Sequence, residues 1–126
     1  AIVVLGLLWC SNLFANNLIG KQLQCGTKNN WMHGNVEYLI FINDKKIRGF
    51  YIDSDTLKVR ETNYEYRAYA KEIEIEWVTL KHYTISRQTL KTSAGKSCKI
   101  IKFNIRETLE KESQQLLNAA QKDNKI

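Results

Sequence analysis

The side chains that could do chemistry in this chain are two histidines, three cysteines and a closely spaced pair of glutamates. Nucleophilic catalysis needs a serine or a cysteine beside a histidine base. His33 lies in a turn-like segment, His82 lies between two expected strands, and no serine occupies a nucleophile-elbow pattern. Glu74 and Glu76 alternate with apolar residues, which indicates the solvent face of a strand. We therefore expect no enzymatic activity and no catalytic residues.

Sequence patterns for cofactors, metals and nucleic acids give the same result. The chain has no glycine-rich phosphate loop, no calcium-loop pattern and no paired-cysteine spacing for a metal. Tyr64, Tyr66, Arg67 and Tyr69 could form a stacking platform for single-stranded nucleic acid. Aromatic residues on strands more often form core and cross-strand pairs. We expect no cofactor, no metal and no nucleic-acid partner.

Lysine and arginine are distributed very unevenly along the sequence. Residues 77–106 carry seven of these cations and no acid, whereas residues 21–76 carry equal numbers of bases and acids. A one-sided positive field favours contact with an anionic envelope surface or polymer. Alternatively, lysines at outward strand positions only keep the sheet edges soluble. The candidate binding residues are Lys81, Arg87, Lys91, Lys96, Lys99 and Lys102, and Arg106 ends the stretch.

The amino-terminal residues have the layout of a secretory signal peptide. The first twenty residues carry no charge, Ala1 to Trp9 is an unbroken apolar run, and Leu13-Phe14-Ala15 is a tolerable cleavage site. We expect a signal peptide over residues 1–15, extending at most to 19, in a sequence that lacks its first few residues. The rival interpretations are an uncleaved membrane anchor and a buried helix. Three asparagines between residues 12 and 17 leave only about half of the ~20 apolar residues that a membrane span needs.

Removal of the signal peptide would discard Cys10 and leave Cys25 and Cys98. An even pair of cysteines in an exported chain predicts a disulfide. The bond would tie the first mature strand to the last one across 73 residues. Closing a loop of this length is worth ~4 kcal/mol in the chain-entropy model. We therefore expect a periplasmic or secreted protein with no stable membrane insertion after cleavage.

The elements that must position these residues follow from composition and periodicity. A chain of 126 residues with 44% hydrophobic and 25% charged residues is an ordinary single globular domain. Apolar and polar residues alternate with period two from residue 20 to residue 105, in short runs separated by turns. We expect a mainly β fold over residues 16–106, either an antiparallel meander or a small partly closed barrel. Residues 107–126 predict a weakly docked helical tail of three or four turns, because helix formers carry only a thin apolar stripe.

Two regions show how the alternation assigns side chains to faces. Between residues 36 and 42, Glu37, Leu39 and Phe41 are expected to share one face, opposite the even-numbered residues. Residues 57–60 and 64–69 are expected to form two separate strands. Because consecutive strands usually neighbour each other, the last two strands should be adjacent and should carry the basic residues together.

Several short segments also carry a resemblance. These are Tyr64-Glu-Tyr, Ile73-Glu-Ile-Glu-Trp77, the late Arg87-Gln-Thr-Leu90, and Cys98-Lys99. Their layout over residues 21–102 resembles small uncharacterised exported bacterial β-meander proteins. The resemblance implies export from a bacterium and a β-meander, and it implies no activity or site residues.

Two functional hypotheses from different classes follow. The first is a non-catalytic exported β-domain, a binding or accessory module with a basic face. The second is a carrier of a small apolar ligand, since a small β-barrel can enclose one ligand. The two hypotheses differ in whether inward side chains fill the interior of the sheet.

Overall fold

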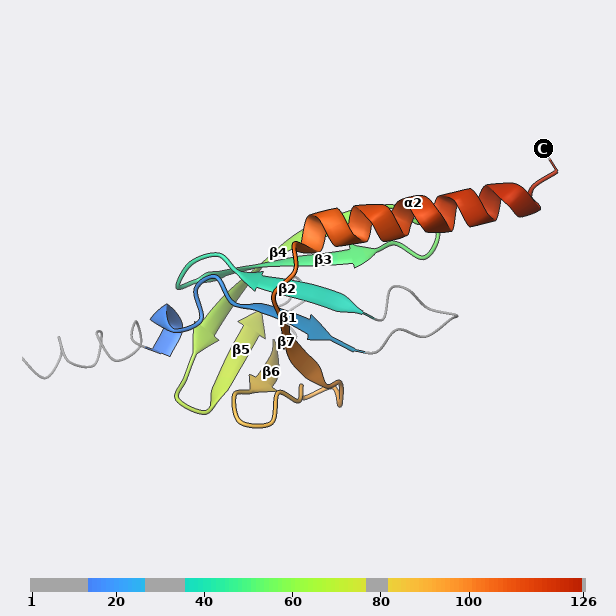
Figure 1. Cartoon of the computed structure of the whole chain (residues 1–126). Coiled ribbons are helices and arrows are strands. Elements are labelled where there is room, and N and C mark those ends of the chain that lie inside the picture. Colours follow the sequence, from blue (N-terminus) through green and yellow to red (C-terminus); the bar gives the residue numbers. More distant parts are fainter. Residues whose placement is uncertain (1–13, 27–35, 77–81, 126) are drawn as a thin grey trace, which may run out of the picture.

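The computed structural model describes residues 14–26, 36–76 and 82–125 of the chain. Seven antiparallel strands form one sheet, and a carboxy-terminal helix follows it (Figure 1). The strands are β1 (Gln22–Cys25), β2 (Glu37–Phe41), β3 (Lys46–Ile52), β4 (Val59–Ala68), β5 (Glu72–Glu76), β6 (His82–Ser86) and β7 (Cys98–Ile101). The helix is α2 (Ile105–Asp123). The sheet curls into a half-barrel, which confirms the prediction of a mainly β fold with a helix at the carboxyl end.

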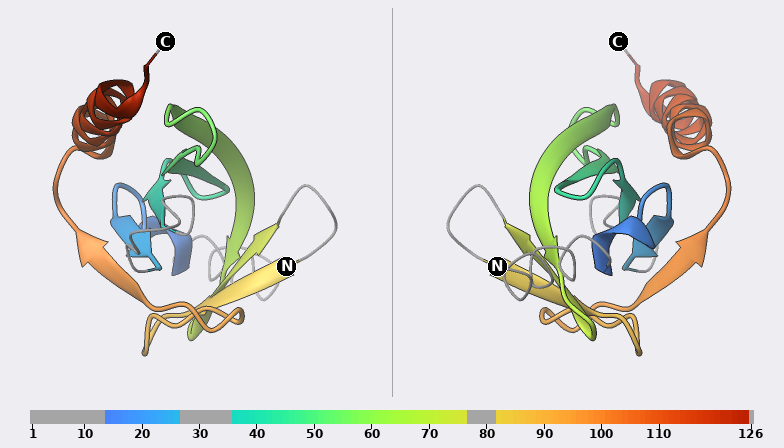
Figure 2. Two further views of the ribbon diagram at one scale, coloured as in Figure 1. Left: turned by 90° about the vertical axis from the view of Figure 1, so that its right-hand side faces the viewer. Right: turned by 90° about the vertical axis from the view of Figure 1, so that its left-hand side faces the viewer.

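The strand order is β6-β5-β4-β3-β2-β1-β7. The expectation that the last two strands are adjacent is therefore wrong, because β6 and β7 form opposite edges of the sheet. β7 pairs with β1, whose free edge was available at the start of the meander. The segment 87–97 runs from one edge to the other (Figure 2). An isolated bridge between Ile85 and Thr92 joins it to β6, and a second bridge between Lys91 and Ser97 lies within it. We call residues 87–97 the strap.

The two strands expected over residues 57–60 and 64–69 are one continuous strand, β4. Its first part pairs with β3 from Val59 to Glu65, and its last part pairs with β5 from Glu65 to Ala68. The sequence pattern suggested a break because the residues before Tyr64 are mostly polar. Those polar residues lie on a strand that is exposed over much of this length, so the pairing continues through them.

The inner face of the half-barrel holds the main core. Alternation places Leu39 and Phe41 of β2, Ile75 of β5 and Ile85 of β6 in it, each almost completely buried. Residues 14–20 close one end of this core, where Ala15 and Leu18 are buried in the same cluster. We call residues 14–20 the plug. The expected signal-peptide cleavage after Ala15 falls inside the plug and stays a prediction.

The helix α2 covers part of the outer face. Ile105 and Leu109 of the helix pack with Tyr38, Phe50 and Ile52 of the sheet. The helix begins two residues before the expected tail because the side chain of Asn104 caps it, accepting a hydrogen bond from the backbone N–H of Glu107 at 3.0 Å. It runs for 19 residues, beyond the expected length, and extends past the end of the sheet opposite the plug (Figure 1).

Candidate functional site

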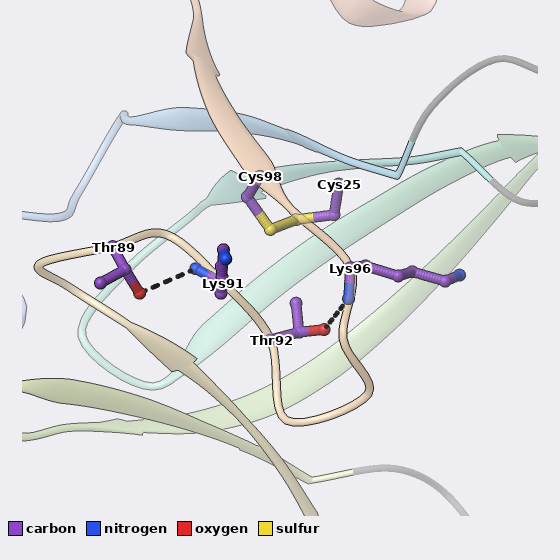
Figure 3. Close-up of a disulfide and its surroundings, with 6 residues drawn as sticks. All are labelled: Cys25, Thr89, Lys91, Thr92, Lys96 and Cys98. Carbon is purple, nitrogen blue, oxygen red and sulfur yellow. Dashed lines mark hydrogen bonds between the residues drawn. A yellow bond between two sulfur atoms is a disulfide. The ribbon is translucent and has the colours of Figure 1, made fainter.

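Cys25 and Cys98 form a disulfide between directly opposed residues of β1 and β7, with their Cα atoms 4.0 Å apart. This confirms the predicted pairing and its position between the first and last described strands. The backbone N–H of Cys98 also donates to the carbonyl of Leu90 at 2.7 Å. The disulfide therefore ties the edge strand β7 to β1 (Figure 3), and the hydrogen bond to Leu90 holds β7 beside the strap.

Among the predicted basic residues, Arg87 forms hydrogen bonds within the fold. Its Nη1 donates to the carbonyl of Tyr69 at 2.8 Å and to the carbonyl of Phe14 at 3.1 Å. The guanidinium thus joins the end of β4 to the plug. Lys81 lies outside the described residues.

Lys91 and Lys96 lie on the strap, and Lys99 lies on β7 (Figure 3 shows the first two). Hydroxyl groups within the strap fix its backbone: the N–H of Lys91 donates to Oγ1 of Thr89, and the N–H of Lys96 donates to Oγ1 of Thr92. Lys91 is paired with Ser97, two residues before Lys99. The structure therefore brings exposed Lys91 and Lys99 to the same edge, through the strap rather than through adjacent strands.

Lys102 lies at a groove on the outer face, in the part of the sheet that α2 leaves uncovered. The groove has a volume of about 310 Å³, at the lower end of the roughly 300–1,000 Å³ typical of small-molecule sites. Ile40, Ile42, Phe50 and Phe103 supply apolar side chains to it. The complete lining is Gln22, Ile40, Ile42, Arg48, Phe50, Lys102, Phe103, Asn104, Ile105 and Arg106.

Three cations, Arg48, Lys102 and Arg106, contribute to the groove. Glu61 lies between the two arginines, 2.8 Å from Nε of Arg48 and 2.6 Å from Nη2 of Arg106. The guanidinium of Arg106 also lies over the ring of Phe50, 5.4 Å from its centroid. One carboxylate neutralises at most one of the three cations, and each guanidinium has five N–H donors. The groove therefore keeps a net positive charge and donors that can bind an anion.

Sequence reasoning missed Arg48 because residues 21–76 are neutral as a whole. The signal that could have found it is its outward position on an alternating strand. Its approach to Arg106 depends on the register of β3 with β4, where Phe50 pairs with Glu61, and on the crossing of α2. Neither can be deduced from local periodicity.

A second polar cluster lies on the inner face of the half-barrel, and sequence reasoning missed this one too. Glu37 shares the inner face with Leu39, as the alternation predicts. Burial raises the pKa of its carboxyl, against the lowering effects of a hydrogen bond with the Tyr64 side chain and of the Lys96 ammonium. Burial and the Glu37 carboxyl raise the pKa of Tyr64. Among the described residues, Oε1 of Glu37 has no hydrogen-bond partner.

The absence of a side chain at Gly49 leaves room for the Glu37 carboxyl on the inner face. A Cβ at Gly49 would lie 2.5 Å from Oε1 of Glu37 and 2.8 Å from Cε2 of Tyr64. The missing side chain therefore gives both groups their place on the inner face. The arrangement can hold a proton on Glu37 at a higher pH than an exposed carboxyl would.

Comparisons with other proteins give no relative: no family model matches the chain, and neither the curated proteins nor the solved structures gave a significant match. Within the described ranges, no group of three or more histidine, cysteine or acidic side chains is arranged to hold a metal ion. None of the helices in those ranges has the length and apolar character of a membrane span.

Proposed function

We propose that this chain is a non-catalytic binding domain of an exported protein, and that it attaches to an anionic surface. The observation that carries the proposal is the groove on the outer face, where Arg48, Lys102 and Arg106 surround apolar side chains. The exposed ammonium groups of Lys91 and Lys99 add positive charge at the strap edge. The proposal assigns no catalytic residue to the chain.

The expected strength of attachment follows from the number of cations. Each basic side chain near an anionic membrane contributes ~1 kcal/mol, and the contribution fades beyond a screening length of ~8–10 Å. Lys99 and Lys102, with the partly neutralised arginines of the groove, supply a few such contacts. Attachment should therefore be reversible and sensitive to salt.

The disulfide supports the part of the proposal that places the protein in an exported compartment. Disulfides persist in oxidising compartments such as the bacterial periplasm and the extracellular space. The Cys25–Cys98 bond is consistent with either of them. The periplasmic or secreted location remains part of the proposal. Cleavage after Ala15 is not part of it, because Ala15 is buried in the core that the plug closes.

A matched pair of charge-reversal variants tests the proposal. Lys99→Glu with Lys102→Glu removes positive charge beside the groove, and Lys58→Glu with Lys122→Glu makes the same change in net charge at exposed positions remote from it. Co-sedimentation with anionic vesicles at low salt should fall at least tenfold for the first pair and much less for the second. Equal losses for both pairs would show that only net charge matters, and would contradict a localised site.

The curled sheet favours a second candidate function, a carrier of a small ligand. The half-barrel shape is compatible with a carrier, and the buried carboxyl of Glu37 beside Tyr64 offers polar groups on the inner face. Native mass spectrometry of protein purified from its host distinguishes the two candidates. A co-purifying small molecule, lost on Glu37→Ala, favours the carrier, whereas a clean mass of the protein alone favours the binding domain.

A further inference from the structure

We propose that the anionic surface is a phospholipid bilayer, and that the plug end of the half-barrel lies against it. This inference rests on the proposed function and deepens it by naming the partner and the docking face. It depends on where exposed apolar side chains, lysines and acids lie among the described residues.

The described residues include six exposed large apolar side chains, and four of them lie at the plug end. Phe14 and Ile19 belong to the plug, Ile42 directly follows β2, and Tyr69 directly follows β4. The right-hand view of Figure 2 looks onto this end. The exposed fractions of these four side chains are 36% for Phe14, 46% for Ile19, 38% for Ile42 and 43% for Tyr69. The other two are Ile100 on β7, which is 57% exposed, and Phe103 after β7, which is 38% exposed.

Hydrogen bonds and the groove bring these residues together at this end of the sheet. Arg87 donates to the carbonyls of both Phe14 and Tyr69, so these two residues lie side by side. The N–H of Gly20 donates to the carbonyl of Phe41 at 2.8 Å, which places Ile19 next to Ile42. Ile42 and Phe103 both line the groove. We call Phe14, Ile19, Ile42, Tyr69 and Phe103 the apolar band.

Charges around the apolar band are mainly positive. The turns and strand ends beside it carry the exposed lysines Lys21, Lys45, Lys46, Lys71 and Lys102, against the acids Asp44, Glu65 and Glu72. At the opposite end, the turn between β3 and β4 carries Asp53 and Asp55 with Lys58. The plug end is therefore more positive than the β3–β4 turn, and it is also the end with most of the exposed apolar side chains.

This combination favours a bilayer over a soluble polyanion. Exposed apolar patches rimmed by polar residues mark protein or membrane interaction sites, and peripheral proteins bury such side chains at the boundary of headgroups and acyl chains. A soluble anionic polymer would satisfy the lysines but would offer no apolar phase for the apolar band.

Hydrogen–deuterium exchange of the protein on anionic phospholipid vesicles locates the docking face. Backbone amides of residues 14–21 and 41–46 should gain protection on the vesicles, and those of residues 53–58 should not. Protection confined to the strap, or to residues 53–58, would overturn the inference while the proposed function stands.

Variants of the apolar band test its contribution. Ile19→Ser with Phe103→Ser should weaken binding to anionic vesicles at least tenfold, and it should abolish the part of the binding that survives high salt. Leu117→Ser, a partly exposed apolar position on α2, is the matched control and should leave binding unchanged. Thermal unfolding of each variant verifies that it is folded.

The same variants separate this inference from the proposed function. Unchanged binding of the Ile19→Ser and Phe103→Ser variant would overturn the bilayer docking. Binding of the unmodified protein to soluble dextran sulfate but not to vesicles would overturn it too, and would leave the proposed function standing. Binding to neither probe would overturn both.

Discussion

Among single residues, Gly49 has the most restrictive surroundings, because the carboxyl of Glu37 and the ring of Tyr64 occupy the space that a side chain would need. We expect Gly49→Ala to destabilise the domain by about 1–3 kcal/mol, as overpacking usually does. Chemical denaturation of the purified protein measures the change.

A double-mutant cycle is the control for this prediction. Glu37→Ala removes one of the two colliding groups, so Gly49→Ala should cost less in that background than in the unmodified protein. A cost within about 0.5 kcal/mol of zero in the unmodified protein, the range of ordinary surface changes, would contradict the close packing at Gly49.

Glu37 itself predicts a dependence of stability on pH. Burial raises the pKa of its carboxyl above the ordinary value of 4.5, so the folded protein binds this proton more tightly than the unfolded chain. The unfolding free energy therefore falls as the pH rises from about 4.5 through the folded pKa, by about 1.4 kcal/mol for each tenfold difference in proton affinity. Glu37→Gln should remove this loss and stabilise the domain at neutral pH, but not at acidic pH.

Denaturation at a series of pH values measures that effect, and Asp53→Asn supplies a control of opposite sign. Backbone hydrogen bonds from Thr56 and Asp55 lower the pKa of Asp53. The stability that ionised Asp53 contributes is present above the pKa of the unfolded state, and it is lost as the pH falls through the pKa of the folded state. Asp53→Asn should therefore destabilise the domain at neutral pH. A pH-independent effect of Glu37→Gln would show that the carboxyl is not destabilised by burial.

Among the elements, β7 depends on the disulfide more than the other strands do. It is a strand of four residues at the edge of the sheet, paired with β1 on one side. We expect Cys25→Ser and Cys98→Ser each to destabilise the domain by ~2–5 kcal/mol. The double variant should be no worse than either single one, because both changes break one bond. A titration that finds reactive thiols at both Cys25 and Cys98 would contradict the pairing.

The elements also show how far a sequence pattern reaches. Period-two alternation correctly predicts that Glu37, Leu39 and Phe41 share one face, since it depends only on the pleat of the strand. The curl of the sheet, which alternation does not predict, makes this the inner face. The position of β7 was not predictable in this way. It depends on which strand edge remains free after the meander has formed, and the sheet places β7 beside β1.

The site was less predictable than the fold for the same reason. Lys102 stands out in the sequence because it belongs to an acid-free stretch. Arg48 and Glu61 do not, since their meeting with Arg106 requires the register of β3 with β4 and the path of α2. The buried surroundings of Glu37 were not predictable either, because Tyr64 of β4 and Lys96 of the strap supply part of them.

On the scale of the whole molecule, exposed apolar side chains and lysines gather at one end. The plug end combines four residues of the apolar band with exposed lysines, and α2 extends past the opposite end of the sheet (Figure 1). A domain attached by its plug end would hold α2 away from the anionic surface. The helix, which is exposed over most of its last two turns, would then remain accessible to a partner or a protease. Limited proteolysis should cleave the last turns of α2 at similar rates with and without anionic vesicles.

Attachment itself is measured by co-sedimenting the unmodified protein with anionic and with zwitterionic vesicles across a salt series. Raising the salt from about 0.1 M to about 1 M shortens the screening length from ~10 Å to ~3 Å. We expect strong pelleting with anionic vesicles at low salt, a steep fall as salt increases, and a small remainder from the apolar band. Zwitterionic vesicles should retain only that remainder. An absence of pelleting with anionic vesicles at low salt, or equal pelleting with both kinds of vesicle at every salt concentration, would contradict attachment through the basic groove.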